Sequence, residues 1–509
     1  MKRASKNSYL KSLKTKIESL WRNIMSSQTE VIETPMLEEI MSKSRYPKED
    51  QSYSIAKQGV AEFISQIVKA DKPEEKINKF ALDEMIAHID DLVSKQMDEI
   101  LHHPDFQQLE ASWRGLYTLV EKTDFNENIK IDLFNVSKAE ALEDFENNAD
   151  ITQTSLYRNF YSSEYGQFGG EPVGAIIGDY EVGVSNPDMD FLNKMSAISA
   201  MSHAPFITSA SAKFFGLDDY TQLPSIQDLK GLLDGPQYTR WRTLRESEDA
   251  KYLGVIATRF LARSPYDPIN NPTKTFNYKE DVSTSHSDLL WGNCAYLFGT
   301  RLTESFAKYR WCGSIIGPNS GGEVNDLPMH FYESMGTIQS KIPTEVLITD
   351  RREYELAEQG FMALTLRRGT NNAVFFSANS VLKPKIFQNT PEGKEAETNF
   401  RLGTQLPYLF LISRMAHYLK VLQREEIGSW KERQDVETGL NTWLKQYISD
   451  QENPPAEVRS RRPFRSASVE VSDVEGEPGV YSIKLCARPH FKYMGANFEL
   501  SLVGKISKD

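Results

Sequence analysis

The sequence predicts a mixed α/β (α+β) fold with a helical N-terminal arm, an α/β body and a C-terminal region that ends in strands. Through the middle of the chain, short apolar runs of strand character alternate with helical segments, which is typical of a parallel or mixed sheet covered by helices. The residues before this body are instead polar and poor in β-branched runs. We therefore divide the 509 residues into an arm with its linker (1–105), a body (106–380) and a C-terminal region (381–509).

The arm is expected to contain four helices. Residues 9–24 place apolar side chains on one face and lysines on the other, a pattern that fits a partner surface, a packed core or a membrane surface. A second helix over 36–46 begins after Pro35 and ends before Pro47, and proline is favoured at both positions. The third and fourth helices cover 54–68 and 80–103, on either side of a hinge at 70–79.

The body is expected to alternate strands and helices. Its predicted strands are residues 129–134, 172–182, 205–212, 253–266, 344–350, 361–367 and 372–379. Between them, helices are predicted from Ser137 as the N-cap residue, over 187–203, over 288–311 and over 351–359. The polar residues 268–287 are expected to form a surface loop, and residues 377–398 a connection to the C-terminal region.

The C-terminal region begins with the most regular helix of the chain. From Leu406 to Trp430, apolar residues recur at the 3.6-residue spacing of a buried helix face. A second helical run follows, ending near residue 450, and three strand candidates come after it at 465–474, 479–491 and 498–506. A strand close to a chain end can pair with a strand of another subunit.

Charge and cysteine content restrict the class of protein. A formal net charge of −12 argues against a nucleic-acid partner, which would require clustered basic residues. The cysteines Cys294, Cys312 and Cys486 are far apart and form no CxxC pair, so we expect buried thiols in a reducing compartment. Lysines interrupt the apolar residues near the N-terminus. We therefore expect no signal peptide and no membrane insertion, and predict a cytoplasmic protein.

The sequence offers no convincing catalytic set. The glycine-rich stretches 169–183 and 317–326 lack the lysine of a phosphate loop and do not open a helix after a strand. The histidines are scattered, with no metal-ligand spacing. We therefore predict a protein that is not an enzyme and has no cofactor, metal or catalytic residues. The basic residues near Arg461 form either a solvated run or a contact with an acidic partner; both readings stay open.

An ordered series of segments resembles the large subunit of the type VI secretion contractile sheath (the TssC/VipB/EvpB family), a relative of phage tail sheath proteins. The resemblance extends from residue 36 to residue 506. It rests on MLEEIMSKSRYPKEDQSYSIAKQGVAEFI, QMDEILHHPDFQQLEASWRGL, RFLARSPY, WGNCAYLFG, GGEVNDLPMHFY, PTEVLITDRREYELAEQGFMAL, RMAHYLKVLQREEIGSW, LNTWLKQYI, RPFRSASVEV and PGVYSIKLCARPHF. Asp267 departs from the family, where glycine is expected after the SPY tripeptide. Each segment alone is a weak signal, whereas their order is specific.

The resemblance implies a phage-tail-sheath-like body and a mechanical function. In this family the large subunit pairs obligately with a small sheath subunit. The heterodimers surround an inner tube as a helical sheath joined to a baseplate. Contraction of the sheath drives the tube outward for effector delivery, and a Clp-class recycling ATPase then takes the contracted sheath apart.

The resemblance also suggests three sets of site residues. Leu37, Ile40 and Met41 correspond to the segment that the recycling ATPase recognises, although a packing helix is an equal alternative. Residues of the helix that faces the inner tube are Lys431, Glu432, Arg433 and Lys445. A sheet shared between subunits is predicted to include the arm together with Val469, Val471, Tyr481, Ile483 and Leu485.

Two other functions stay open at the level of sequence. One is a phage-type tail sheath protein that assembles without a small partner. The other, less favoured, is a nucleotide-dependent α/β enzyme that would use one of the glycine-rich stretches.

Overall fold

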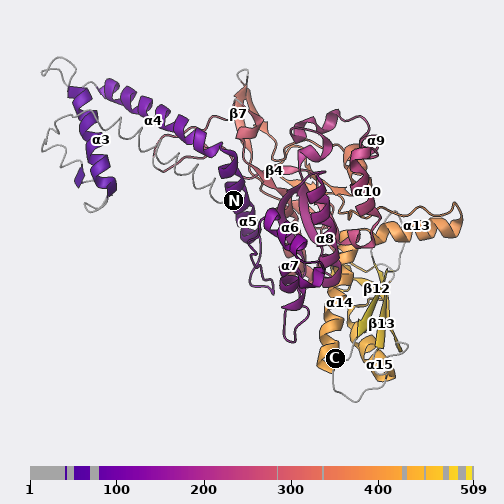
Figure 1. The fold of residues 1–509 in the computed structure, drawn as a ribbon. Coiled ribbons are helices and arrows are strands. Elements are labelled where there is room, and N and C mark those ends of the chain that lie inside the picture. Colours follow the sequence, from indigo (N-terminus) through magenta and orange to yellow (C-terminus); the bar gives the residue numbers. More distant parts are fainter. Residues whose placement is uncertain are drawn as a thin grey trace. The chain divides into compact units, whose positions relative to one another are not determined.

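The computed structural model describes residues 41–42, 51–68, 79–274, 276–283, 285–334, 337–426, 433–451, 454–473, 481–490 and 500–506. The chain divides into two compact units, one of residues 1–95 with 274–278 and one of residues 96–273 with 279–509. Figure 1 shows their secondary structure. We consider each unit by itself.

The first unit contains the two long arm helices. They are α3 (Gln51–Val68) and α4 (Lys79–Leu101), and the last turn of α4 belongs to the second unit. Both helices were predicted. The helix predicted at 9–24 and the hinge residues 70–78 lie outside the described residues.

A four-stranded parallel sheet forms the centre of the second unit. Its order is β1 (Ile176–Val182), β2 (Phe206–Ala210), β3 (Leu253–Ile256) and β9 (Phe361–Met362), and each neighbouring pair is parallel. Nearly continuous apolar runs favour a parallel sheet because both of its faces are buried. The predicted mixed α/β class is confirmed.

Successive residues of these strands enter two different hydrophobic cores. On β2, Phe206 belongs to a core with Trp241 and Phe361, whereas Ile207 belongs to a second core with Phe298 and Met362. This alternation follows from the two-residue period of a strand. A Cβ added at Gly254 of β3 would lie within 3 Å of Ile207 and Met362. Glycine therefore allows the second core to pack directly on the strand.

The second unit also contains helices and antiparallel sheets, several of which are labelled in Figure 1. The helices are α5 (Pro104–Glu121), α6 (Lys138–Asn147), α7 (Ser155–Tyr157), α8 (Asn186–Ser202), α9 (Leu229–Leu233), α10 (Thr239–Glu246), α11 (Cys294–Tyr309), α12 (Asp350–Glu358), α13 (Pro391–Gly403), α14 (Leu406–Glu426), α15 (Arg433–Leu444) and α16 (Ala456–Arg461). The antiparallel strands are β4 (Arg259–Leu261) with β5 (Trp291–Asn293); β6 (Glu323–Val324), β11 (Ala373–Phe375) and β10 (Leu364–Leu366); β7 (His330–Ser334) with β8 (Thr337–Lys341); and β12 (Phe464–Asp473), β13 (Tyr481–Pro489) and β14 (Leu500–Ile506).

Several helices begin at the residues that the sequence indicates. Ser137 caps α6 in a capping box: its hydroxyl accepts from the Glu140 N–H, and the Glu140 carboxylate accepts from the Ser137 N–H. His103 caps α5 by accepting from the Asp105 N–H at 3.3 Å. These bonds satisfy N–H groups that have no partner within the helix.

Five local predictions are wrong or incomplete. Residues 129–134 form no strand, although their apolar and polar residues alternate. Leu133 and Phe134 are exposed, and among the described residues no strand pairs with this segment. Residues 344–350 contribute only a single bridge, between Thr344 and Phe260. The single strand predicted at 253–266 is divided into β3 and β4. The helix predicted from residue 288 begins only at Cys294, because residues 291–293 form β5 and pair with β4. The connection predicted at 377–398 contains the first turns of α13.

Helix α14 links two hydrophobic cores. Leu406, Leu409 and Phe410 belong to the second core of the parallel sheet. One turn later, Ile412, Met415 and Leu419 belong to a third core, formed with the C-terminal sheet. A single helix therefore joins the C-terminal sheet to the body.

Two histidines, the buried His417 and the half-buried His203, lie where α14 meets the body. His417 of α14 has its Nε2 2.9 Å from the Ser202 carbonyl oxygen, and His203 has its Nδ1 3.0 Å from the Tyr252 hydroxyl. The Tyr165 ring contacts both imidazoles. Burial lowers the pKa of His417 to about 3 and that of His203 to about 4, and nearby cations add to both shifts.

These pKa values predict acid sensitivity. The unfolded state takes up protons near the ordinary histidine pKa of about 6.5, whereas the folded state resists until pH 4 to 3. The free energy of unfolding is therefore expected to fall as pH drops below about 6.5, by up to about 1.4 kcal/mol per pH unit for each histidine. Urea denaturation of His417→Gln between pH 7 and 4.5 should show a shallower fall. The exposed His88→Gln is the matched control, and equal slopes for the two variants would contradict the prediction.

Candidate subunit interface

The C-terminal sheet is a three-stranded antiparallel sheet in the order β12, β13, β14. All three strands were predicted. Val469 lies opposite Leu485, Val471 opposite Ile483 and Asp473 opposite Tyr481. Strand β14 pairs with β13 from Tyr481 opposite Ile506 to Ala487 opposite Leu500. The five residues predicted for a shared sheet are thus neighbours on two adjacent strands.

One face of this sheet packs on helices. Val469, Val471, Ile483 and Leu485 are buried in the third core, with Leu440 and Leu444 of α15 and Met415 of α14. Tyr481 packs against this core while partly exposed. These apolar side chains therefore attach the sheet to its own chain, and only the backbone of an outer strand can pair with another subunit.

The outer edge of β12 is occupied by the chain itself. Asn441 of α15 accepts a hydrogen bond from the Val469 N–H at 2.9 Å and donates one to the Val469 carbonyl at 2.8 Å. The Ser449 N–H donates to the Phe464 carbonyl at 2.9 Å. A side-chain amide carries the same donor and acceptor as a peptide group. Asn441 therefore takes the position of a neighbouring strand.

The opposite edge of the sheet is formed by β14. Among the described residues, no strand pairs with the outer side of β14. An unpaired strand edge presents backbone N–H and C=O groups that can add a further strand. Strand β14 is thus the edge of this sheet at which addition needs no rearrangement of α15.

The residues predicted to contact an inner tube have different environments. Lys431 and Glu432 lie outside the described residues. Arg433 begins α15, and its Nη1 lies 3.4 Å from the Val471 carbonyl oxygen, so the side chain is already engaged with β12. Lys445 is exposed in the short 3₁₀ helix after α15.

The segment predicted for ATPase recognition is only partly described. Leu37 and Ile40 lie outside the described residues, whereas Met41 is buried. Recognition of Met41 would require release of its side chain from that packing.

The carboxyl ends of the parallel strands are filled by an ion-pair cluster. Open α/β enzymes bind their ligands at such an edge. Here the Arg259 guanidinium donates to both carboxylate oxygens of Glu345, at 2.6 and 2.8 Å. His286 and the Tyr220 N–H approach the same carboxylate, each at 3.2 Å. Burial alone would raise the pKa of Glu345, but the bonds from His286 and Arg259 hold it below its ordinary value.

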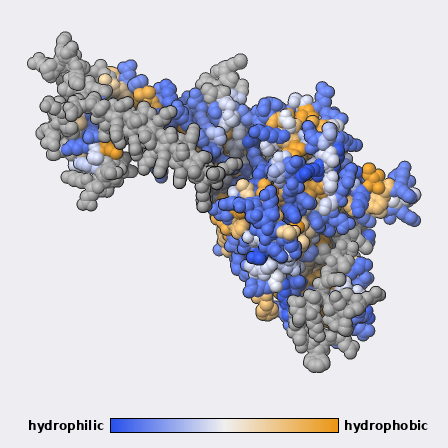
Figure 2. Space-filling view, in the orientation of Figure 1, coloured by the Kyte–Doolittle hydropathy of each residue, from blue (hydrophilic) through white to orange (hydrophobic). Residues whose placement is uncertain are grey.

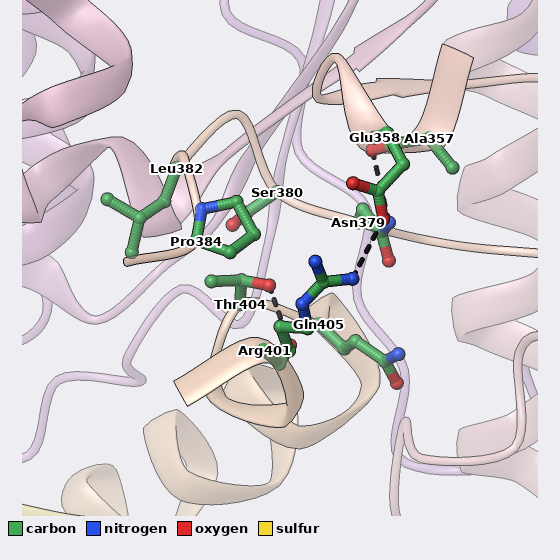
Figure 3. A pocket seen from close by; sticks show the side chains of 9 residues that line it. All are labelled: Ala357, Glu358, Asn379, Ser380, Leu382, Pro384, Arg401, Thr404 and Gln405. Atoms are coloured by element: carbon green, nitrogen blue, oxygen red, sulfur yellow. Dashed lines mark hydrogen bonds and ion pairs between the residues drawn. The ribbon is translucent and has the colours of Figure 1, made fainter. Parts of the chain in front are cut away.

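A hollow between α12 and the end of α13 is too small for a cofactor. It holds about 20 Å³, enough for one water molecule, whereas small-molecule sites occupy several hundred Å³. Figure 3 shows that Arg401 and Glu358 face each other across it, and their ion pair measures 3.0 Å.

The glycine-rich stretches form no ligand site of their own. Residues 169–175 precede β1 without regular structure. In the second stretch, the Gly317 N–H donates to the Phe375 carbonyl, and Gly321 has a φ of +90°, which glycine adopts readily. Across the described ranges, no helix is long and apolar enough to cross a membrane. Within the same residues, no group of three or more His, Cys, Asp or Glu side chains could hold a metal ion.

Comparison with known proteins identifies the family. Residues 83–382 match the EvpB/VC_A0108 tail sheath N-terminal domain, and residues 395–506 match the EvpB/VC_A0108 tail sheath gpW/gp25-like domain. The chain belongs to the EvpB/VC_A0108 tail sheath family. It is 40% identical over 431 residues to the type VI secretion system sheath protein TssC1 of Pseudomonas aeruginosa, covering 84% of this chain and 86% of that relative.

Membership of the tail sheath family has direct consequences. The chain is a structural subunit of a secretion sheath and not an enzyme, and it interacts with other sheath subunits. A solved sheath tail protein from Desulfitobacterium hafniense has 8% sequence identity and a TM-score of 0.29, over 65% of this chain and 57% of that one. A likeness at that level adds nothing to the assignment.

Sequence reasoning did not find Asn441 or the Arg259–Glu345 pair. Asn441 bonds a strand 28 residues away, and 86 residues separate Arg259 from Glu345. Neither pairing leaves a local pattern in the sequence.

Replacing Asn441 with alanine is expected to weaken the C-terminal sheet. The variant leaves the half-buried Val469 N–H and carbonyl without their partner, at a cost of about 1–3 kcal/mol in the free energy of unfolding. Urea denaturation measures the change. Thr442→Ala, on the exposed side of the same helix, is the matched control, and the prediction is wrong if the two variants are equally stable.

Proposed function

We propose that this chain is the large subunit of a two-component contractile sheath. It forms an obligate heterodimer with a small sheath subunit, and the heterodimers surround an inner tube that ends at a baseplate. Contraction drives the tube outward for effector delivery by type VI secretion. The assembly is cytoplasmic and attached to an envelope-anchored baseplate, and a Clp-class ATPase recycles the contracted sheath. Identity of 40% to a type VI secretion sheath protein supports this proposal.

The C-terminal sheet is the single structural feature that favours a lattice role. A contractile lattice must keep its subunits connected while they move as rigid bodies. Added strands suit this task because backbone hydrogen bonds continue to hold while the linkers bend. One edge of the sheet is closed by Asn441 and the other is formed by β14. We therefore assign the strand of a neighbouring subunit to the β14 edge.

Two further contacts belong to the proposal. The helix that begins at Arg433, with Lys431, Glu432 and Lys445, faces the inner tube and holds it by weak charged contacts. The segment of Leu37, Ile40 and Met41 is the site for the recycling ATPase. A sheath that assembles without a small subunit is the alternative to the two-component assembly.

Removal of β14 tests the lattice role. The chain is co-expressed with a small sheath subunit of the same organism and examined by negative-stain electron microscopy. The full chain should form hollow tubes only in the presence of the small subunit. A truncation after residue 499 should retain the heterodimer but form no tubes, because the strand that joins neighbours is missing.

Truncation after Ile506 keeps β14 and serves as the control. Tubes from the shorter truncation would refute the role of β14. Tubes from the chain alone would favour the self-assembling alternative, and no tubes from the co-expressed full chain would contradict the two-component function.

Charge reversal at Lys445 tests the tube contact. Lys445→Glu places an acidic side chain at an exposed position after α15. Sheath tubes should still form, but the inner tube protein should no longer sediment with them, because a releasable charged contact becomes repulsive. Lys213→Glu, exposed elsewhere on the body, is the control. Unchanged sedimentation of the inner tube with Lys445→Glu sheaths would contradict the assignment.

A further inference from the structure

Helix α5 carries an exposed apolar ridge. Its side chains Phe106, Leu109, Trp113, Tyr117 and Val120 are 37, 56, 59, 63 and 41% exposed. They are spaced by three, four, four and three residues, which places them on one face along the whole helix. We call these five residues the α5 ridge. Isolated exposed apolar residues are ordinary, whereas a continuous row of five marks a binding surface.

The opposite face of α5 is fixed to the body. Leu119 is buried, and a Cβ added at Gly115 would overlap the Tyr296 ring of α11. On one flank, Glu110 accepts a hydrogen bond from the Arg263 Nε at 2.8 Å, and Arg263 also pairs with both oxygens of Glu280. These contacts set the rotation of the helix about its axis. The ridge is therefore preformed and faces outward.

The ridge has the spacing of a helix-packing seam. Steps of three and four residues keep side chains on one face of a helix, and such a face is the kind that packs along another helix. A strand or a loop would not match this period. Figure 2 shows that the visible face of the second unit is mainly hydrophilic with separate hydrophobic patches.

The charges near the ridge indicate the chemistry of its occupant. Asp105 lies at the start of α5, Glu121 at its end and Asp124 just beyond, and all three are exposed. The one basic residue within α5, Arg114, is already paired with Glu110 at 2.7 Å. Lys122, which follows the helix, donates a hydrogen bond to the Asn325 carbonyl oxygen. A helix with basic residues at both ends of its apolar seam would complement this pattern.

We propose that the α5 ridge is the docking surface for one amphipathic helix of the partner subunit. The apolar seam of that helix covers the ridge, and its lysines or arginines face Asp105 and Glu121. This assignment rests on the proposed function, in which the chain pairs with a small sheath subunit. It adds which surface of this chain the pairing uses.

Polar substitutions on the ridge test the proposal. Trp113→Gln and Tyr117→Gln replace exposed side chains by a good helix former, so the body should still fold. The tagged chain is co-expressed with the small sheath subunit, and the amount of small subunit that co-purifies with it is measured. Each variant should retain at most about a tenth of the small subunit that the unaltered chain retains. Phe168→Gln, which alters an aromatic residue 77% exposed outside the ridge, should bind normally.

The charge assignment has its own measurement. Glu121→Lys should weaken the same pairing and reduce its dependence on salt, because an attractive contact becomes repulsive. Stronger pairing of this variant would overturn the basic character of the occupant.

The remaining outcomes separate the two levels of the proposal. If the unaltered chain does not bind the small subunit, the proposed function fails. If it binds and both glutamine variants bind equally well, only the ridge assignment fails. Light scattering of the chain alone tests two other occupants, a second copy of the chain and a segment of the same chain. A dimer of the unaltered chain that is absent in Trp113→Gln would identify a second copy. A monomer that is compact in the unaltered chain and expanded in Trp113→Gln would identify a segment of the same chain, and either result would overturn the assignment to the partner subunit.

Discussion

The architecture depends on helix α14, which belongs to two hydrophobic cores at once. Its first turns pack on one face of the parallel sheet through Leu406 and Phe410, and its later turns pack on the C-terminal sheet through Met415 and Leu419. Because close-packed cores transmit displacement instead of absorbing it, a force on the C-terminal sheet reaches the body through a continuous helix. The buried His417 extends this connection to Ser202 of α8. Such a rigid linkage is what a subunit needs if its neighbours are joined to one end.

The two edges of the C-terminal sheet differ in what pairs with them. Free strand edges are a hazard in any sheet protein because they pair with whatever strand they meet. On β12 a side chain bonds the backbone instead of a further strand. Asn441 supplies the donor and the acceptor that a neighbouring peptide group would give to Val469. Among the described residues, no further strand pairs with β14. In the lattice that we propose, a neighbouring strand is therefore added at β14.

Features carried by local periodicity could be predicted, and features carried by distant contacts could not. The helix at Leu406, the capping box at Ser137 and the three C-terminal strands follow from spacing and from residue type. The α5 ridge could also have been predicted from the sequence, because its residues are spaced by three and four within one helix. The strand predicted at 129–134 was wrong because its formation depends on a distant partner. An alternating pattern favours a strand only where another strand can pair with it.

The sequence by itself determined the family, the mixed α/β class and the order of most elements, because these depend on residue pattern along the chain. Only the tertiary structure decided that Asn441 bonds the outer edge of β12, and that the Arg259–Glu345 pair fills the edge of the parallel sheet at which open α/β enzymes bind ligands. It also decided that Arg433 contacts β12. Each of these depends on side chains brought together from positions 28 to 86 residues apart. Packing alone creates such contacts, and no local pattern encodes them.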